Sequence, residues 1–160
     1  MMLENMITGI IQLVVAIVLS VVALYIGFSV FARITTKIDE EEELAKGNAA
    51  VGIVVASVFI SIAIVIQSGI AGVSMGIKGA IAGNMYPLIA SVLQLVLGIT
   101  LAIGAIYIAL NVLDRMTKEI DEFAEIKKGN VAVALEMAGV IIAVSIIIQS
   151  GVLGITSSLS

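Results

Sequence analysis

Residues 120–155 read IDEFAEIKKGNVAVALEMAGVIIAVSIIIQSGVLGI, and residues 38–73 read IDEEEELAKGNAAVGIVVASVFISIAIVIQSGIAGV. The two stretches align without a gap at an offset of 82 residues, and the triplet KGN recurs at 46–48 and 128–130. Each stretch places a short charged segment before a long apolar run. The sequence therefore predicts the duplication of one helical unit.

The duplication extends toward the N-terminus at the same offset. Gln12 corresponds to Gln94 and Tyr25 to Tyr107. This correspondence predicts a first repeat over residues 1–78 and a second over residues 83–160, together forming one membrane domain.

The composition is that of a membrane protein, because 61% of the residues are hydrophobic and only 12% are charged. Four apolar runs, at residues 6–32, 49–73, 88–113 and 131–155, each approach or exceed the ~20 residues that span a hydrocarbon core as a helix. None shows the alternation typical of a membrane β-barrel strand. We expect an all-α membrane protein with four transmembrane helices, and a lipid bilayer as its surroundings.

Several functional classes lose their usual residues. The chain has no Cys and no His, which removes thiolate nucleophiles, imidazole bases and the common zinc ligands. The net charge of -4 offers no basic surface for nucleic acid, and no glycine-rich phosphate loop is present. We therefore expect neither an enzyme nor a cofactor, metal or nucleic-acid site, and we assign no catalytic residues.

The basic residues predict how the chain is oriented. All of them except Lys78 lie between the paired apolar runs, in loops 33–48 and 114–130. The positive-inside rule places such loops in the cytoplasm. The prediction is thus a multi-pass protein of a prokaryotic plasma (inner) membrane, with both termini extracytoplasmic and two parallel helical-hairpin repeats.

Each cytoplasmic loop is predicted to contain a short amphipathic helix at the membrane interface. Gly47 and Gly129 then occupy the position where a helix end favours a left-handed residue, and Asn48 and Asn130 the N-cap of the next helix. A ligand-binding turn is the alternative for this motif. The acidic run 39–43 is either a solvated face or a surface for a basic protein partner or cations. Residues 74–87, rich in Gly, are expected to form an outer-surface connection.

Glu136 is the main candidate functional residue, because a carboxylate within a transmembrane segment costs several kcal/mol unless it is paired, protonated or hydrated. It lies about 9 Å along its helix from Asn130, and its counterpart in the first repeat is Val54. It shares a face with small residues that favour close helix contact, so we expect it to point at protein. The candidate partners at similar depth are Asn111, Tyr107, Arg115 and Arg33.

One glutamine lies toward the outer end of each predicted helix. These four residues are candidates for interhelical hydrogen bonds, each contributing on the order of 1 kcal/mol, and they are Gln12, Gln67, Gln94 and Gln149.

The paired helices, the IDE segments and the KGN turns resemble the membrane family known as domain of unknown function 350, over essentially the whole chain. The resemblance implies small inner-membrane proteins without an established enzymatic activity. Bacterial relatives encoded beside phage-shock-type or polyamine-synthase-like proteins motivate a hypothesis of membrane maintenance or stress response.

Two functions are consistent with these patterns. The first is a homo-oligomeric structural or interaction protein, whose acidic cytoplasmic loops recruit a partner. The second is an oligomeric ion or proton channel, or a small transporter, that uses Glu136.

Overall fold

The computed structural model describes residues 2–34, 38–117 and 120–159, and every regular element in these ranges is an α-helix. Lys37 and Lys118, which count toward the predicted orientation, lie outside the described residues. The elements are α1 (Met2–Ile34), α2 (Glu40–Ala45), α3 (Ala49–Ile81), α4 (Tyr86–Met116), α5 (Glu122–Lys127) and α6 (Val131–Leu159). The predicted helical class is confirmed.

Each of the four long helices contains a segment long and apolar enough to cross a membrane. These segments are Met6–Val30, Ala49–Gln67, Tyr86–Arg115 and Val131–Gly154. Continuous apolar helices of this length satisfy their backbone hydrogen bonds internally, as a bilayer requires. The chain is therefore a multi-pass membrane protein.

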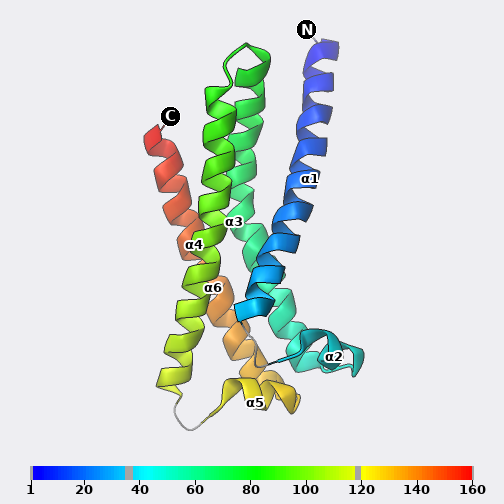
Figure 1. The fold of residues 1–160 in the computed structure, drawn as a ribbon, viewed down its shortest axis with the longest axis vertical. Helices are drawn as coiled ribbons and strands as arrows, with labels where there is room; N and C mark the ends of the chain where they lie inside the picture. Colours follow the sequence, from blue (N-terminus) through cyan, green and yellow to red (C-terminus); the bar gives the residue numbers. More distant parts are fainter. Residues whose placement is uncertain (1, 35–37, 118–119, 160) are drawn as a thin grey trace.

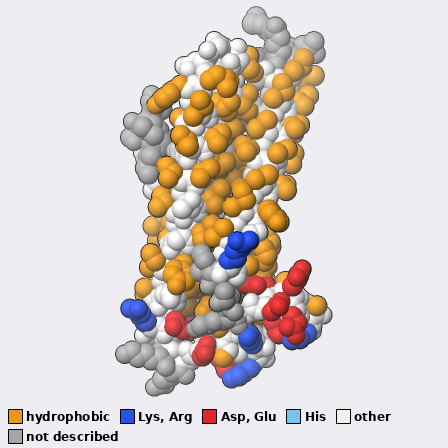
Figure 2. Space-filling model, in the orientation of Figure 1, with side chains coloured by type: hydrophobic (Ala, Val, Ile, Leu, Met, Phe, Trp, Pro, Cys, Tyr) orange, Lys and Arg blue, Asp and Glu red, His pale blue; other side chains and the backbone are white. Residues whose placement is uncertain are grey.

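The long helices lie side by side, and the short helices α2 and α5 lie together at one end, which we call the loop end (Figure 1). At the opposite end, α1 begins, α6 ends and a turn joins α3 to α4. Charged side chains gather at the loop end, while the sides of the bundle are apolar (Figure 2). Apolar sides of this kind are suited to contact with lipid.

α3 is the central helix. It packs against α1, α4 and α6, and 56% of its spanning segment is buried, compared with 11% of that of α1. α1 is therefore the peripheral helix of the bundle.

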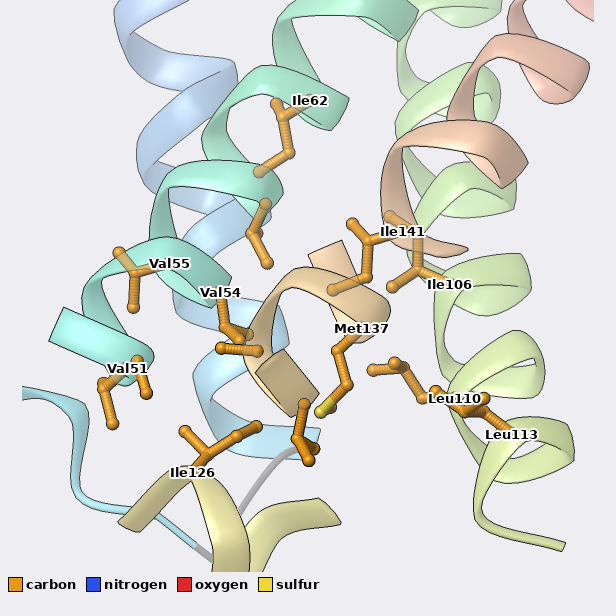
Figure 3. Close-up of a cluster of buried hydrophobic side chains, with 14 of the residues drawn as sticks. Val51, Val54, Val55, Ile62, Ile106, Leu110, Leu113, Ile126, Met137 and Ile141 are labelled. Carbon is orange, nitrogen blue, oxygen red and sulfur yellow. The ribbon is translucent and has the colours of Figure 1, made fainter. Parts of the chain in front are cut away.

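The core lies between α3, α4 and α6 in the half of the bundle nearer the loop end (Figure 3). Ile126 of α5 is completely buried and closes this core from the loop end. Members of this core include Val51, Val58, Ile62, Ile66, Ile106, Leu110, Met137 and Ile141.

The KGN turns have the predicted local structure. Gly47 and Gly129 adopt left-handed φ angles of 77° and 84°. In each turn the glycine N–H bonds to the carbonyl three residues back, and the asparagine N–H to the carbonyl five residues back, as in a Schellman motif. Asn48 and Asn130 then accept hydrogen bonds from the first turns of α3 and α6.

The expected connection over residues 74–87 is wrong for its first half, because α3 continues to Ile81. Glycines in this stretch serve helix packing. A Cβ placed on Gly76 would lie 2.6 Å from Leu88 Cα, and one on Gly79 would lie 3.2 Å from Pro87 Cγ. Small residues of this kind allow two helix backbones to approach closely in a membrane. The actual turn spans residues 82–85, where Gly83 has a φ of 90°.

Candidate functional site at the loop end

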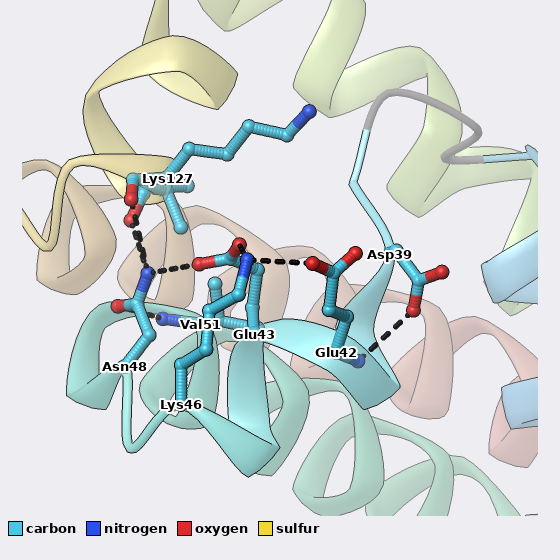
Figure 4. Close-up of polar contacts among 8 residues, drawn as sticks. Asp39, Glu42, Glu43, Lys46, Asn48, Val51 and Lys127 are labelled. Atoms are coloured by element: carbon cyan, nitrogen blue, oxygen red, sulfur yellow. Dashed lines mark hydrogen bonds and ion pairs between the residues drawn. The ribbon is translucent and has the colours of Figure 1, made fainter.

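Asn48 joins the two repeats at the loop end (Figure 4). Its Oδ1 accepts from the N–H groups of Ala50 and Val51 at 3.1 and 3.3 Å, which caps α3. Its Nδ2 donates to the carbonyl oxygens of Ile126 and Lys127, at 3.0 and 3.2 Å, at the end of α5. One side chain therefore satisfies helix-terminal groups in both repeats.

Asn130, the counterpart of Asn48, makes only local bonds among the described residues. Its Oδ1 caps α6, and its Nδ2 donates to Glu125 Oε2 at 2.9 Å. The corresponding bond from Asn48 to Glu43 Oε2 is also 2.9 Å. The cross-repeat bonds are thus what distinguishes the two KGN turns.

The carboxylates of α2 and of its N-cap Asp39 form an acidic surface at the loop end, which comprises residues 39–43. Asp39 caps the helix by accepting from the N–H of Glu42 at 3.0 Å. Lys46 bridges to Glu42 and Glu43 at 2.8 and 2.9 Å. Hydrogen bonds from Asn48 and Lys46 lower the pKa of Glu43, and hydrogen bonds to Glu42 and Glu43 raise the pKa of Lys46. The acidic surface is therefore held by local bonds.

A second group of carboxyls lies where α4, α5 and α6 meet. Glu122 is only 2% exposed, and its Oε2 has no hydrogen-bond partner within the described part of the chain. Burial raises the pKa of Glu122, and the negative charges of Asp114 and Glu136 raise it further. The arrangement favours a protonated carboxyl between two further acidic residues.

Thr117, the C-cap residue of α4, lies beside Glu122. Its hydroxyl donates to the Leu113 carbonyl oxygen at 2.8 Å, and Glu122 Oε1 is its other polar neighbour. This contact places the Glu122 carboxyl against the end of α4.

We expect Glu122→Gln to change the pH dependence of stability. Because the folded protein binds this proton more tightly than the unfolded chain, the stabilisation is complete below the unfolded pKa and is lost as pH rises through the raised folded pKa. Between the two values the wild type should lose on the order of 1 kcal/mol per pH unit. Thermal unfolding in detergent, scanned across pH, measures this slope, which should flatten in Glu122→Gln.

Glu40→Gln is the matched control, because Glu40 is the counterpart of Glu122 and lies only partly buried on α2. It should keep the wild-type slope. An unchanged slope in Glu122→Gln would show that Glu122 is not the protonated group.

Glu136 does not point into the bundle of its own chain, contrary to expectation. It lies on an exposed face of α6, and no hydrogen bond or ion pair joins it to another described residue. Ala134, two positions before Glu136, and Met137, one position after it, are both buried. Because successive helical residues are turned by about 100°, Glu136 and its buried neighbours cannot share one face.

Among the described residues, none of the other candidates forms a hydrogen bond or ion pair with Glu136. The amide of Asn111 donates to the Tyr107 carbonyl oxygen of its own helix at 2.7 Å, and Tyr107 is exposed. Arg33 and Arg115 are exposed in the last turns of α1 and α4. The negative charge of Glu136 instead acts on Glu122, whose pKa it helps to raise.

The sequence did not predict this cluster of three carboxyls. One usable signal was the difference between the repeats, since Asp114 and Glu136 correspond to Ala32 and Val54 in the first repeat. Acidic side chains added on two separate helices of one repeat indicate a local change of environment. Their proximity depends on how α4, α5 and α6 cross, which the sequence does not show.

The glutamines are partly joined as expected. Gln149 Nε2 donates to Gln67 Oε1 at 3.4 Å, and these residues are counterparts. Gln94 Oε1 lies beside Gly72, 3.8 Å from the position of a Cβ there, and Gln12 also makes an interaction. The structure thus confirms one interhelical pair.

Comparison with known proteins identifies one family. The model of the family described as Domain of Unknown Function (DUF350) matches residues 5–100 and again residues 87–160, so two matches cover nearly the whole chain. No curated protein and no solved structure gave a significant match. The overlap of the two matches agrees with a tandem duplication, and the chain belongs to the DUF350 family.

Proposed function

We propose that the protein is a non-enzymatic, homo-oligomeric structural or interaction protein of a prokaryotic plasma membrane, active in membrane maintenance or stress response. The observation that carries this proposal is the acidic surface of α2, which Asn48 attaches to α5 and to the bundle. Fixed charges at the end of a membrane bundle suit recognition of a basic protein partner, because complementary charge steers association.

In this proposal the loop end faces the cytoplasm, and the repeats are parallel helical hairpins with α2 and α5 near the lipid headgroups. The basic residues of loops 33–48 and 114–130, which are all except Lys78, support that orientation. α2 has no buried residues, and Glu41 and Glu42 are exposed on its surface.

Neutralising two charges on α2 tests the proposal. We expect Glu40→Gln with Glu41→Gln to abolish copurification of a basic cytoplasmic protein at physiological salt, because charge complementarity is lost. Glu42 and Glu43 stay unchanged, since both bond to Lys46. The matched control is Glu40→Asp with Glu41→Asp, which keeps both charges. Equal recovery of the partner by the neutral and the charge-retaining variants would contradict the proposal.

A second candidate function is an oligomeric ion or proton channel, or a small transporter, that uses Glu136. The observation favouring it is the cluster of three carboxyls formed by Asp114, Glu122 and Glu136, in which burial raises the pKa of Glu122. Carboxyls at these positions offer successive proton sites between the loop end and the membrane interior.

Flux through liposomes tests this second function. We expect Glu136→Gln to reduce proton flux by roughly tenfold or more, because the amide cannot exchange a proton. Glu40→Gln is a suitable control, since it removes a carboxyl from the other repeat. Unchanged flux in Glu136→Gln, with assembly impaired, would assign Glu136 a structural role.

A further inference from the structure

An open groove runs between α1 and α3, with a volume of about 440 Å³. Ser20 and Leu24 of α1 form one wall. The other wall belongs to α3, and its residues are Ile60, Ala63, Ile64, Ile66, Gln67 and Ile70. Except for Ser20 and Gln67, the lining is apolar.

Half of the residues that line this groove have buried counterparts in the second repeat. The counterparts of Ser20, Leu24, Ala63 and Ile70 are Ala102, Ile106, Ser145 and Val152, and all four counterparts are buried. They lie on α4 and α6, and α3 packs against both helices. At Gly98 of α4, a Cβ would lie 3.6 Å from Val65 of α3 and 3.6 Å from Val152 of α6. α3 therefore occupies the cleft that corresponds to the open groove.

α6 is the counterpart of α3, yet it leaves the corresponding face open. Val65 on α3 is 2% exposed, whereas its counterpart Ile147 on α6 is 70% exposed. Ser61 is completely buried, whereas its counterpart Ala143 is exposed. The difference arises because α4 covers this face of α3. The counterpart of α4 is α1, which packs mainly against α3 and so does not cover the corresponding face of α6.

α1 is open in a complementary way. Leu95 on α4 is 6% exposed, and its counterpart Leu13 on α1 is 60% exposed. Ser91 bonds to the Gly72 carbonyl oxygen at 2.8 Å, whereas its counterpart Gly9 has no heavy atom within 4 Å of a Cβ position. The α1–α3 groove and the open face of α6 thus repeat the two sides of a contact that exists inside the chain.

Lipid tolerates exposed apolar side chains, but Glu136 argues for a protein neighbour. It lies on the same open face of α6 as Ala143, about 9 Å along the helix from Asn130. A carboxylate facing acyl chains at that depth costs several kcal/mol. Its counterpart Val54 is buried in the chain, so a neighbour that repeats the internal contact would cover Glu136 as well.

We propose that subunits assemble head to tail, with α6 of one subunit seated in the α1–α3 groove of the next, as α3 is seated between α4 and α6. This inference rests on the homo-oligomer of the proposed function and names its interface. The two sides of the contact are different surfaces, so the interface is heterologous and assembly closes into a ring or continues as a filament. Ile147 would then lie against Ala16 of the neighbouring subunit, as Val65 lies against Gly98.

Cysteine cross-linking tests this contact, because the chain has no Cys of its own. We expect Ala16→Cys with Ile147→Cys, oxidised in membranes by copper phenanthroline, to form a ladder of cross-linked dimers, trimers and larger species. Each single-Cys variant should remain uncross-linked, because every bond joins two different positions. The matched control is Val18→Cys with Ile146→Cys, at similar depth but on other faces, and it should give no ladder. Both control positions are about half exposed.

The outcomes separate this interface from oligomerisation itself. Dimers from either single-Cys variant would show an isologous contact and overturn the inference. A ladder from the control pair, without one from the test pair, would also overturn the inference, but it would be consistent with a homo-oligomer. A wild type that is monomeric by native mass spectrometry in nanodiscs would overturn both.

Filling the groove gives a second test. Ala63→Trp places a large ring where α6 of the neighbour would lie, and overpacking of this kind should raise the subunit dissociation constant on the order of tenfold or more. Leu101→Trp, at an exposed position of α4, should leave assembly unchanged. Circular dichroism checks that both variants fold. Unchanged assembly of folded Ala63→Trp would exclude the groove as the interface.

Discussion

Gly76→Ala is expected to destabilise the protein strongly. The added Cβ would lie 2.6 Å from Leu88 Cα and 2.9 Å from Leu88 N. These are backbone atoms of α4, so no side-chain rotation relieves the overlap, and α3 and α4 must separate. The expected cost is about 3 kcal/mol, at the upper end of the usual range for overpacking. Thermal unfolding followed by circular dichroism in detergent measures it.

Gly104→Ala is the control for this substitution. Gly104 also lies within a long helix, but a Cβ there meets nothing within 4 Å. Alanine has the higher helix propensity, so this variant should be equal to the wild type or up to about 1 kcal/mol more stable. If Gly76→Ala were as stable as Gly104→Ala, the close approach of α3 and α4 would be refuted.

Asn48→Ala is the other substitution with a large expected effect. It removes the cap of α3, worth about 1 kcal/mol, and it leaves the Ile126 and Lys127 carbonyl oxygens without the amide donor. It also removes the local bond to Glu43. Each lost hydrogen bond adds about 1 kcal/mol, so a total of roughly 4 kcal/mol is expected. Asn130→Ala loses its cap and the corresponding local bond to Glu125, and by the same count should cost roughly 2 kcal/mol.

The difference between these two variants measures the attachment between the repeats. Asn48→Ser separates it from capping, because serine keeps a cap acceptor but has no amide to reach α5. We expect Asn48→Ser to lose most of the stability that distinguishes Asn48→Ala from Asn130→Ala. Equal unfolding temperatures for the two alanine variants would mean that the cross-repeat bonds contribute nothing.

The loop-end turns show why local structure was predictable. A glycine before an asparagine supplies a left-handed residue and an N-cap within two positions, and both turns adopt this structure. The Gly-rich stretch after residue 73 misled the prediction because glycine serves turns and close helix packing equally well. Gly76 and Gly79 belong to the second case, and only the position of α4 distinguishes the two.

The clustering of the carboxyls of Asp114, Glu122 and Glu136 could not be predicted from the sequence, for a related reason. These residues come from α4, α5 and α6, so their proximity depends on three helices crossing. The position of Glu136 along α6 could be predicted by counting residues from Asn130. Its exposure could not be predicted, because the duplication suggests that Glu136 and its buried counterpart Val54 occupy equivalent environments.

The sequence by itself determined the helical class, the four membrane-spanning segments, the duplication and the capped turns, because these depend on run length and on residues within a few positions of one another. The tertiary structure alone decided which face of each duplicated helix is buried. α3 is covered because residues 82–85 join it directly to α4, whereas no such turn brings α1 against α6. Similar sequences in the two repeats therefore have different neighbours, and these neighbours decide which residues are buried.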